Sequence, residues 1–593
     1  MISSIPGDDA PVLLIQDRDA GGWWRFDEIR AVLAADRVED VIPRLVQLEA
    51  RVNAEGLWAA GFISYEAAPA FDPAIRAHAP RACPLVWMGL FPPPRLIAEP
   101  SWPSARTPAH DWQSSIGRPE YDRAVERVRD LIAAGETYQA NFTFRLRSQL
   151  VGTPRALFSR MLQFGDPGFG AYLECGDLAV CSASPELFFR LEGHRLVSRP
   201  MKGTAARGTT QSDDLECSRR LAASEKDRAE NVMIVDMVRN DLNRVARAGS
   251  VRVEGLFDLE RYPTLWQMTS TVSAQTEKPV VDVLRALFPA ASITGAPKIR
   301  TTGIIADLEA DPRGVYTGCI GYIAPRRRAQ FNVAIRTAVV DRRTGAMEYG
   351  VGGGIVWDSR SESEYEECRI KARLVSEPPP RFSLLETMLW EPAAGYFLVD
   401  LHLRRLAESA DYFGIRLDSA RIEIRLGEAV AGLPPVPHRV RLLVGGDGST
   451  SLEAEPIAES SQPVRLRLAA EPVDPANRFL YHKTTHRGVY ERARATRTGC
   501  DDVILWNPRQ EVTETTIANL VLELDGRKMT PRGEAGLLPG VFRRWLLNRG
   551  EIEEAWVSLD DLRLATRLWT INSVRKWRLA RLVDEDGERD VPG

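Results

Sequence analysis

The sequence predicts a mixed α/β and α+β protein built from several domains. Its 593 residues exceed one ordinary domain and suffice for two or three. Residues 116–376 alternate long amphipathic helices with strands, whereas residues 382–593 are rich in short β-hairpins. Between these regions, Pro378, Pro379 and Pro380 predict a stiff, extended linker over residues 377–381.

Each region has its own pattern in chain order. Residues 1–110 mix strands, such as LWAAGFISY, with short loops and form the N-terminal region of the first module. Helices are expected from Glu225 onward and over residues 361–375, where apolar residues recur at helical spacing. After the prolines FSLLETMLW predicts a strand, and VRLLVGGDGSTSLEAEPI and NLVLELDGRKMTP predict hairpins with Asp-Gly at the turn.

Composition excludes several classes of protein. The chain is 44% hydrophobic and 27% charged, as soluble globular proteins are, and its net charge of −4 gives no strong attraction to nucleic acid or to anionic membranes. No apolar run approaches the roughly 18 residues of a membrane helix, and MISSIPGDDAPVLL lacks the pattern of a signal peptide. Seven cysteines without a CxxC pair indicate reduced thiols, so a cytoplasmic location is expected.

Lys202 is the most informative residue of the chain. It lies between Pro200 and Gly203, where the backbone is expected to bend and to present the side chain. A lysine becomes a nucleophile when its surroundings lower its pKa, which is expected here. Glu186, sixteen positions upstream, is a candidate carboxyl partner. Alone, such a lysine is more often a solvated surface charge.

A group of carboxylates follows downstream. Glu364, Glu367 and Lys371 have the spacing of one helix face, and Glu230 lies on another expected helix. Carboxylates gathered from separate helices suit Mg²⁺, which prefers oxygen ligands. The spacing alone favours a solvated face in which Ser361 and Glu364 form a helix capping box, without excluding the metal site. The residues alone leave both interpretations open.

Eight ordered strings between about Ser182 and Ala372 resemble the chorismate-utilising enzymes, a family that includes anthranilate, isochorismate, salicylate and aminodeoxychorismate synthases. The strings are SPELFF, RPMKGTAARG, ENVMIVDMVRNDLNRV, SITGAPKIR, GVYTGCIGYI, FNVAIRT, YGVGGGIVWDS and SEYEECRIKA. In this family, a lysine at position 202 marks aminodeoxychorismate synthases, whereas anthranilate synthases have a small residue there.

The resemblance implies roles for individual residues. It assigns Lys202 as the nucleophile that adds to ring C2 of chorismate and Glu186 as the general acid for the C4 hydroxyl. It implies Mg²⁺ bound by Glu230, Glu364 and Glu367. It implies a substrate pocket formed by Arg336, Tyr316, Thr294, Gly352, Gly353 and Lys371.

One position departs from part of the family. Anthranilate and salicylate synthases have a histidine where TLWQMTST has Gln267, and glutamine cannot act as an acid. An anthranilate-type reaction is therefore the weaker alternative. The sequence also lacks a convincing motif for feedback by tryptophan.

A second set of strings resembles the fold-type IV pyridoxal phosphate enzymes, which include branched-chain and D-amino-acid aminotransferases and aminodeoxychorismate lyase. They are HLRRL, HKTTHR, VTETTIANL and GLLPGVFRRWLL, within residues 382–577. The resemblance implies that Lys483 binds pyridoxal 5'-phosphate covalently and that Glu514 pairs with its ring nitrogen. The phosphate site would comprise Arg405, the turn from Leu538 through Gly540 to Val541, Asn572 and Ser573. Thr387 matches a substrate threonine after a one-residue gap.

Two lysine sites in one chain suggest consecutive reactions from chorismate and ammonia to 4-aminobenzoate, a folate precursor. The alternatives are an amino-acid transaminase in the second module, an anthranilate-type synthase in the first, and a scaffold without catalysis. No Gly-x-Cys-x-Gly motif of a glutaminase is present, so a separate glutamine amidotransferase subunit is the expected ammonia source. The resemblance is also compatible with a homodimer through the second module. His482 and His486 have the spacing of a metal pair but lack a third ligand.

Overall fold

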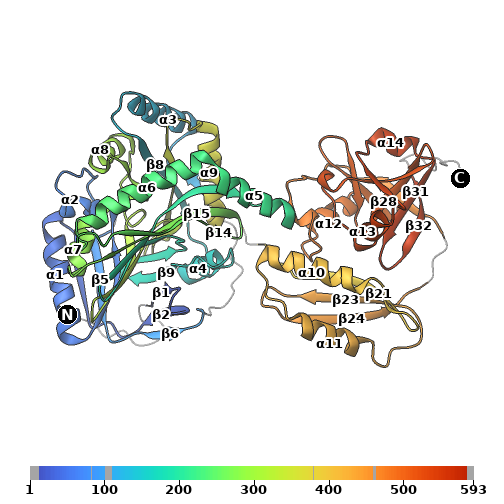
Figure 1. Ribbon diagram of the computed structural model, residues 1–593, viewed down its shortest axis with the longest axis horizontal. Coiled ribbons are helices and arrows are strands. Elements are labelled where there is room, and N and C mark those ends of the chain that lie inside the picture. Colours follow the sequence, from blue (N-terminus) through green and yellow to red (C-terminus); the bar gives the residue numbers. More distant parts are fainter. Residues whose placement is uncertain (1–11, 82, 101–109, 378–379, 459–461, 584–593) are drawn as a thin grey trace. The chain divides into compact units, whose positions relative to one another are not determined.

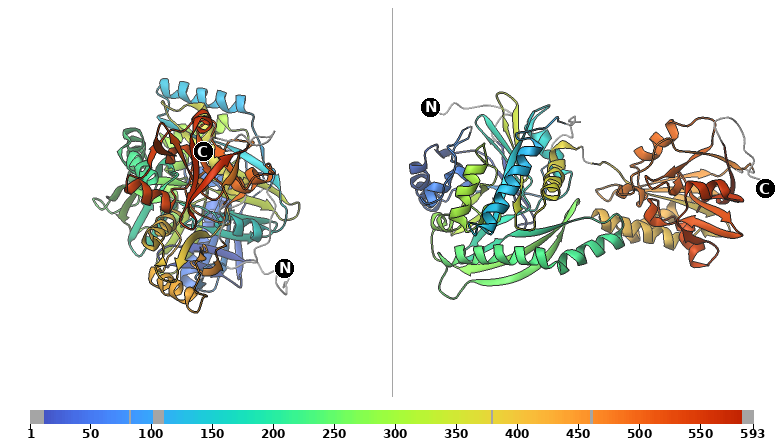
Figure 2. Two further views of the ribbon diagram at one scale, coloured as in Figure 1. Left: turned by 90° about the vertical axis from the view of Figure 1, so that its right-hand side faces the viewer. Right: turned by 90° about the horizontal axis from the view of Figure 1, so that it is seen from above.

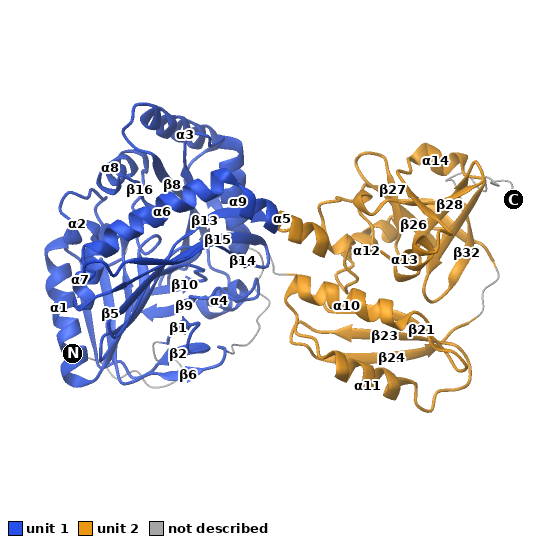
Figure 3. Cartoon of the chain, in the orientation of Figure 1, with its two compact units in different colours: residues 1–206, 218–379 blue, residues 207–217, 380–593 orange. Residues whose placement is uncertain are grey.

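The computed structural model describes residues 12–81, 83–100, 110–377, 380–458 and 462–583. The chain folds into two compact units (Figure 3). The first comprises residues 1–206 and 218–379, and the second comprises residues 207–217 and 380–593. Both units mix helices and strands (Figure 1), which confirms the mixed fold class. No helix of the described residues is long and apolar enough to cross a membrane. Of the predicted proline linker, Pro378 and Pro379 lie outside the described residues.

The first unit contains two ten-stranded sheets. In order across the first sheet the strands are β16 (Gly295–Ala296), β8 (Gln139–Gln149), β20 (Ala346–Ile355), β19 (Thr337–Asp341), β10 (Leu178–Ser182), β9 (Ala171–Cys175), β1 (Leu13–Asp17), β2 (Gly22–Phe26) and β6 (Arg95–Ile97), with β7 (Gln113–Ser114) beside β8. In order across the second they are β13 (Met201–Ala206), β15 (Leu265–Gln275), β12 (Arg195–Arg199), β11 (Leu187–Glu192), β18 (Arg328–Val333), β17 (Cys319–Ala324), β4 (Trp58–Ile63), β5 (Val86–Phe91) and β3 (Ala31–Ala35), with β14 (Arg252–Arg261) beside β15.

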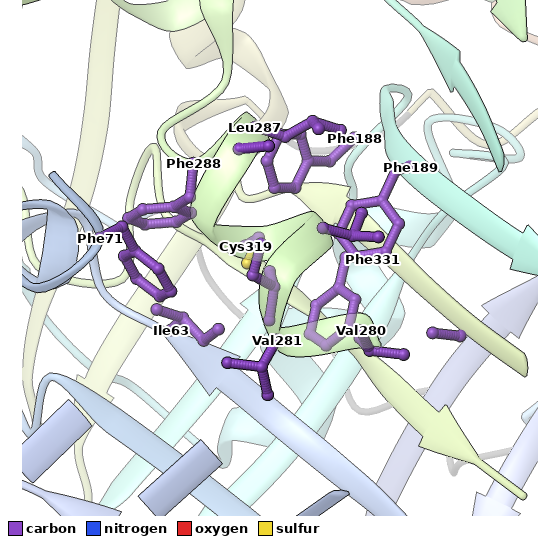
Figure 4. Packing of buried hydrophobic residues seen from close by; sticks show 14 of the residues in the cluster. Ile63, Phe71, Phe188, Phe189, Val280, Val281, Leu287, Phe288, Cys319 and Phe331 are labelled. Atoms are coloured by element: carbon purple, nitrogen blue, oxygen red, sulfur yellow. The ribbon is translucent and has the colours of Figure 1, made fainter. Parts of the chain in front are cut away.

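Side-chain alternation along the strands shows how these sheets pack. In β17, Ile320 and Tyr322 join a cluster shared with strands of the other sheet, whereas Cys319 and Ile323 join the cluster on the opposite face. Because neighbouring residues of a strand point to opposite faces, β17 is buried on both sides. Figure 4 shows part of the cluster on that opposite face, including Phe188 and Leu287. The strands of residues 1–110 are interleaved with later strands, so this region completes the sheets of the first module.

Helices cover the outer faces of both sheets. The second sheet packs against α1 (Val38–Glu55), α6 (Glu225–Asn243) and α7 (Val280–Leu287), and α6 runs along β13 and β15 (Figure 2). The first sheet packs against α3 (Arg118–Ala133), α4 (Pro154–Leu162) and α9 (Ser361–Ser376). The remaining helices of this unit are α2 (Ala68–Phe71) and α8 (Lys298–Leu308). The result is an α/β/β/α arrangement with three apolar layers.

The second unit has a small and a large sheet. The small sheet contains β22 (Gly395–Tyr396), β21 (Leu384–Glu391), β23 (His438–Val444) and β24 (Thr450–Pro456), covered by α10 (Val399–Phe413) and α11 (Ser419–Val430). The large sheet contains β27 (Val512–Thr515), β26 (Asp502–Trp506), β25 (Val464–Leu468), β32 (Lys576–Leu582), β31 (Arg567–Asn572), β28 (Asn519–Leu524), β29 (Arg527–Pro531) and β30 (Glu553–Ala555). Helices α12 (Gly488–Ala495), α13 (Val541–Asn548) and α14 (Leu559–Leu564) accompany it. Both predicted hairpins are present, and Asp525 and Gly526 have the positive φ angles of a tight turn.

Residues 207–217 belong to the second unit, although the sequence placed them within the 116–376 domain. Helix α5 (Gln211–Ala223) begins in this segment. Arg207 forms a buried ion pair with Asp214 at 2.6 Å, and its guanidinium lies over the ring of Tyr412. The Tyr412 hydroxyl donates to the carbonyl of Gly208, and a ring nitrogen of His482 contacts the carbonyl of Thr209. The segment is therefore part of the core of the second unit.

We predict that Asp214→Ala lowers the stability of the second unit by about 3–5 kcal/mol, because it leaves Arg207 as a buried charge without its carboxylate. The measurement is denaturant unfolding followed by far-UV circular dichroism. Asp213→Ala is the matched control, since Asp213 is an exposed neighbour on the same helix turn. Equal midpoints for the two variants would contradict the role of this ion pair.

Candidate active sites

The first unit holds a cavity of about 380 Å³ where β13, β20, α6 and α9 converge. It collects most of the residues proposed for the first site. Those that line it are Glu186, Lys202, Glu230, Tyr316, Arg336, Gly352, Gly353, Glu364, Glu367 and Lys371. Thr294 is buried but is absent from the wall, and its hydroxyl donates to the carbonyls of Ala290 and Ala291. A direct contact of the Thr294 hydroxyl with substrate is therefore not supported.

Lys202 lies on β13, at the edge of the second sheet. The strand has a bulge between Met201 and Thr204, and Gly203 has a φ of 99°, so the expected bend occurs within a strand. The Nζ atom of Lys202 lies against the backbone of Gly354 on β20. A Cβ atom added to Gly354 would be only 2.2 Å from this Nζ atom. The third glycine of the run in β20 therefore makes room for the Lys202 amine.

Glu186 lies in the connection that leads from β10 to β11. It is almost fully buried, and burial raises the pKa of its carboxyl to about 7, although nearby Lys202 opposes this shift. Ser292 donates a hydrogen bond of 2.6 Å to Glu186 Oε1. A carboxyl group with a pKa near neutrality can give up a proton during a reaction at that pH. The geometry thus suits a general acid beside Lys202.

The carboxylates of α6 and α9 face the same cavity. Burial raises the pKa of Glu230 and of Glu364, and for Glu364 the neighbouring charge of Glu367 adds to this rise. Glu367 pairs with Lys371 at 2.7 Å, and this cation lowers its pKa. Lys371 also donates to the carbonyl of Gly352. Glu230 forms an ion pair with Lys226 at 4.0 Å, whereas Glu364 has no ion pair among the described residues.

The capping-box interpretation of α9 is wrong. Arg360 occupies the N-cap position, and Ser361 is already the first helical residue. The Ser361 hydroxyl contacts Asp122, while Glu364 accepts a hydrogen bond from Ser359 at 2.7 Å. Among the described residues no three acidic, histidine or cysteine side chains cluster as a metal site. Two carboxylates facing a cavity still fit Mg²⁺, because this ion commonly keeps several waters and takes its other ligands from substrate.

Arg336 is a cation without an anionic partner. No carboxylate of the described residues forms an ion pair with it, and burial lowers the pKa of its guanidinium. Its guanidinium lies 5.5 Å from the ring centre of Tyr262. Tyr316 lines the wall nearby, and its ring lies so close to Gly350 that a Cβ there would be 2.2 Å from it. A cavity with an unmatched guanidinium favours an anionic ligand.

Sequence reasoning missed Gln139, the first residue of β8. Its amide oxygen and nitrogen are both buried without a hydrogen-bond partner among the described residues. Its Nε2 would lie 2.3 Å from a Cβ on Gly354, so it ends beside the same backbone as Lys202. The available signal was a row of polar residues at alternate positions, Gln139, Asn141 and Thr143, on one face of this strand. The remaining polar wall includes Gln267, which donates to the carbonyl of Gly203 and so supports the bulge.

The second unit holds a cavity of about 630 Å³. All the residues proposed for the cofactor and substrate of the second site line it: Thr387, Arg405, Lys483, Glu514, Leu538, Gly540, Val541, Asn572 and Ser573. Burial, reinforced by Arg405, lowers the pKa of Lys483 to about 8. Its amine is therefore partly neutral near physiological pH, as covalent attachment to an aldehyde requires.

Glu514 is a buried carboxyl held by neutral donors. The backbone N–H of Leu538, the hydroxyl of Tyr490 and the amide of Asn519 donate to it at 3.1, 2.9 and 3.2 Å. Burial raises its pKa to about 7. A protonated ring nitrogen would supply the missing countercharge, so the site fits pyridoxal phosphate.

Arg405 is fixed by Glu386, which accepts hydrogen bonds of 2.9 and 2.7 Å from its guanidinium. Although burial raises the pKa of Glu386, Arg405 and His402 bring it down to about 2. Arg405 also contacts the carbonyl of Pro539, in the turn that begins α13. An arginine and a helix N-terminus thus meet at one end of the cavity, which is an arrangement that binds phosphate.

His482 and His486 do not act together. His482 uses one ring nitrogen toward Ser409 and the other toward the carbonyl of Thr209, and burial lowers its pKa to about 4. His486 packs against the ring of Phe479. The pair at helical spacing therefore serves packing.

Comparisons with known proteins agree with two sites of different kinds. Residues 94–377 match the chorismate binding enzymes, and residues 383–583 match the class IV amino-transferases. The chain thus joins a chorismate-binding enzyme domain to a class IV aminotransferase domain.

Two relatives of the first domain carry different names. An aminodeoxychorismate synthase of Streptomyces griseus is 42% identical over 273 residues, which are 46% of this chain and 37% of the relative. An anthranilate synthase component 1 of Aquifex aeolicus is 39% identical over 266 residues, 44% of this chain and 53% of the relative. The chain thus spans between 37% and 53% of the length of these relatives. Since both match almost equally well, overall identity does not choose between their reactions.

A solved structure supports the fold of the first unit. The crystal structure of anthranilate synthase component I from Streptococcus pneumoniae aligns with a TM-score of 0.52 at 22% identity. The alignment covers 64% of this chain and 94% of that chain.

We predict that Gly354→Ala lowers the rate of the reaction in the first cavity at least about tenfold, because the added methyl group displaces Lys202 and Gln139 from their places. Steady-state kinetics with chorismate and ammonium would measure this loss. Gly353→Ala is the comparison, since its Cβ would meet only Glu364 Oε2, at 3.3 Å. A Gly354→Ala protein with parental kinetics would show that Lys202 does not need this position.

Proposed function

We propose that this chain makes 4-aminobenzoate from chorismate and ammonia in two consecutive reactions. The observation that carries the proposal is Lys202, whose amine enters a cavity that also holds Glu186 and the unpaired Arg336. A second lysine site, at Lys483, lies in another unit of the same chain.

The first reaction exchanges the C4 hydroxyl of chorismate for an amino group. Lys202 forms a bond to ring C2 while the C4–O bond breaks, and Glu186 protonates the departing hydroxyl to give water. Ammonia then forms a bond to C4 as the bond from C2 to Lys202 breaks. The product is 4-amino-4-deoxychorismate, and Lys202 is regenerated.

The substrate is a dianion, and the wall offers matching groups. Arg336 is placed to bind one carboxylate. Glu230 and Glu364 would hold Mg²⁺, with Glu367 and Lys371 beside them, and the ion would neutralise the second carboxylate. Ammonia would come from a separate glutamine amidotransferase subunit or from free ammonium.

The second reaction removes pyruvate from aminodeoxychorismate and leaves the aromatic ring of 4-aminobenzoate. Pyridoxal phosphate, when bound, supplies an electron sink. Lys483, with its lowered pKa, takes the proton from ring C4. Glu514 holds the countercharge of the cofactor ring, and Arg405 with the turn before α13 holds its phosphate.

The charge of the second cavity favours this lyase reaction over transamination of an ordinary amino acid. Seven cationic and three acidic side chains line it. The cations are Arg405, Arg439, Arg441, Lys483, Arg487, Arg575 and Arg578, and the acids are Glu455, Asp502 and Glu514. Burial lowers the pKa of Arg575, and Arg578 and Arg439 add to this effect. Arg405 pairs with Glu386, Arg439 with Glu455 and Arg441 with Glu453. Arg575 has no ion pair among the described residues, so it could bind the second carboxylate of aminodeoxychorismate, which carries one carboxylate more than a simple amino acid.

For the first module, Lys202 and Gln267 argue against the anthranilate-type alternative. An anthranilate reaction needs ammonia at C2, the carbon that Lys202 would occupy. The catalytic side chains of both cavities are present, which argues against an inactive scaffold.

We predict that the rate of the first reaction falls as the pH rises through about 7. Only the protonated carboxyl of Glu186 can donate, and its raised pKa places the loss of that proton near 7. Glu186→Gln should remove this limb of the pH profile and slow the step about 10²–10⁴-fold. Initial rates of aminodeoxychorismate formation at saturating chorismate measure both effects. A rate that is flat across this pH range would contradict the acid role.

A product assay tests the proposed function as a whole. The parent protein, given chorismate, ammonium, Mg²⁺ and pyridoxal phosphate, should release 4-aminobenzoate and pyruvate. Lys483→Ala should lose the absorbance of covalently bound cofactor and accumulate aminodeoxychorismate, because its synthase site is in the other unit. Lys202→Ala should make no aminodeoxychorismate but should still consume that compound when it is supplied.

Chelation supplies a matched control for this assay. Removing Mg²⁺ should stop amination of chorismate and leave the lysis of supplied aminodeoxychorismate intact.

For the product assay, release of 4-aminobenzoate by Lys483→Ala at the parental rate would overturn the assignment of the second site.

A further inference from the structure

His402 is a buried histidine whose second ring nitrogen has no partner among the described residues. Its side chain is only 1% exposed and lies on α10, which packs against β21 (Figure 1). Nδ1 lies 2.7 Å from Glu386 Oε2, whereas Nε2 forms no hydrogen bond with a described residue. His402 also lines the cavity of about 630 Å³ in the second unit. Because buried polar atoms nearly always have a partner, this Nε2 in a cavity wall indicates a ligand that binds there.

Arg405 shares its carboxylate partner with His402. The two residues are three positions apart on α10 and therefore lie on the same face of the helix. Glu386 Oε1 accepts from Arg405 Nε at 2.9 Å, and Oε2 accepts from Arg405 Nη2 at 2.7 Å and contacts His402 Nδ1. Arg405 also donates to the carbonyl of Pro539, in the turn before α13. His402 thus lies at the end of the cavity where this arginine meets the start of α13.

The contact with Glu386 determines which nitrogen of His402 carries a proton. Although burial raises the pKa of Glu386, Arg405 and His402 bring it down to about 2, so this group is a carboxylate that can only accept. In the neutral ring the proton is therefore on Nδ1, and Nε2 has a lone pair. Nε2 becomes a donor only when the ring takes up a second proton.

The charges around His402 disfavour that second proton. Burial lowers the pKa of His402, and Arg405 and Lys483 add to this effect, whereas Glu386 opposes it. The imidazole is therefore mainly neutral near physiological pH. An anion placed beside Nε2 would reverse the balance, because an opposite charge favours the protonated ring.

The same end of the cavity has little uncompensated positive charge for a phosphate group. The charge of Arg405 is paired with that of Glu386 at 2.7 Å. On α13, which packs against α10, Arg544 pairs with Glu408 at 3.3 Å. A phosphate monoester has its second pKa at about 6 and is mainly a dianion at neutral pH. A protonated His402 would add the missing charge and a donor at once.

We propose that His402 binds the phosphate of the cofactor through Nε2 and takes up one proton as it does so. The inference rests on the proposed pyridoxal phosphate site of the second unit. The proton comes from solvent when the phosphate enters as a dianion, and from the phosphate itself when it enters as a monoanion. In both cases His402 becomes an imidazolium that donates from Nδ1 to Glu386 and from Nε2 to a phosphate oxygen.

Proton uptake makes the affinity for the phosphate group depend on pH. One proton bound together with a ligand changes its dissociation constant about tenfold per pH unit. Because the pKa of His402 is higher with the phosphate than without it, the gain in affinity is complete at low pH and is lost as the pH rises. Between about pH 7 and pH 8, the phosphate in solution has lost its second proton, so the full dependence is expected there.

Two ligands isolate the phosphate group in the test. Pyridoxamine 5'-phosphate is the probe, since its amine cannot form a Schiff base with Lys483. Isothermal titration calorimetry with protein freed of cofactor gives its Kd at pH 7 and at pH 8. Pyridoxamine, measured by its competition with this probe, lacks the phosphate and reports the pH dependence of all other contacts.

Three variants separate the role of Nε2 from that of packing. His402→Gln places a neutral donor near the position of Nε2 but cannot take up a proton. His402→Asn keeps a donor near the position of Nδ1, toward Glu386, and lacks the nitrogen in the cavity wall. His438→Gln is the matched control, because His438 is a buried histidine of the same unit that does not line the cavity and contacts the carbonyl of Val436. Far-UV circular dichroism confirms that each variant is folded.

In the parent protein, Kd for pyridoxamine 5'-phosphate should rise by about five- to tenfold more than Kd for pyridoxamine between pH 7 and pH 8. His402→Gln should lose this difference, and any contribution of Lys483 stays in both proteins. His402→Asn should also weaken binding of the phosphate form about tenfold or more at pH 7, with Kd for pyridoxamine unchanged. His438→Gln should behave as the parent does.

Three results would overturn the role of His402. The first is an equal pH dependence for the two ligands in the parent, which needs no variant. The second is a His402→Gln protein that keeps the parental difference, and the third is an equal loss in His438→Gln, which indicates general repacking. A parent protein that binds neither ligand would instead refute the proposed cofactor site, and the two failures are thereby distinguished.

Discussion

Both cavities contain ionisable side chains that are buried away from water and are not fully neutralised by a neighbouring opposite charge. Burial raises the pKa of Glu186 and of Glu514 to about 7, and it lowers the pKa of Lys483 to about 8. Arg336 is buried without a carboxylate partner. Each of these groups is unfavourable in the isolated protein, and each becomes favourable when a ligand of opposite charge or a transferable proton is present. The same desolvation therefore prepares binding and catalysis.

Close approach of backbone supplies the second constraint. Lys202 lies on the edge strand of one sheet, and its amine ends against Gly354 in the other sheet. Only the absence of a side chain there lets the Lys202 amine and the Gln139 amide share the space. In the second unit, Gly540 is held in the same way against Asn519, because a Cβ would lie 2.0 Å from its Oδ1. Both sites thus depend on glycine at one position where two segments meet.

The two units are also linked through the path of the chain. The strand of Lys202 ends at Ala206, and the next eleven residues, 207–217, fold as part of the second unit. Thr209 of this segment contacts His482, the neighbour of Lys483. A cut at the proline linker would therefore separate residues 380–593 from part of their own core, although the linker is the visible boundary in the sequence.

The sequence by itself determined the two domain families, and it predicted most of the residues that line the two cavities, because the side chains that define the chemistry occur in short ordered strings. Short sequence segments were enough to predict roles for Lys202, Glu186, Lys483 and Glu514. They were also enough to predict the two hairpins, because an Asp-Gly turn depends only on its own residues. Only the tertiary structure decided which groups meet across long separations in the chain. It excluded Thr294 from the cavity wall and added Gln139, whose importance depends on a neighbour more than two hundred positions away. It also joined Asp241 to Lys298 and residues 207–217 to the second unit, since packing and burial, which no local pattern records, fix such contacts.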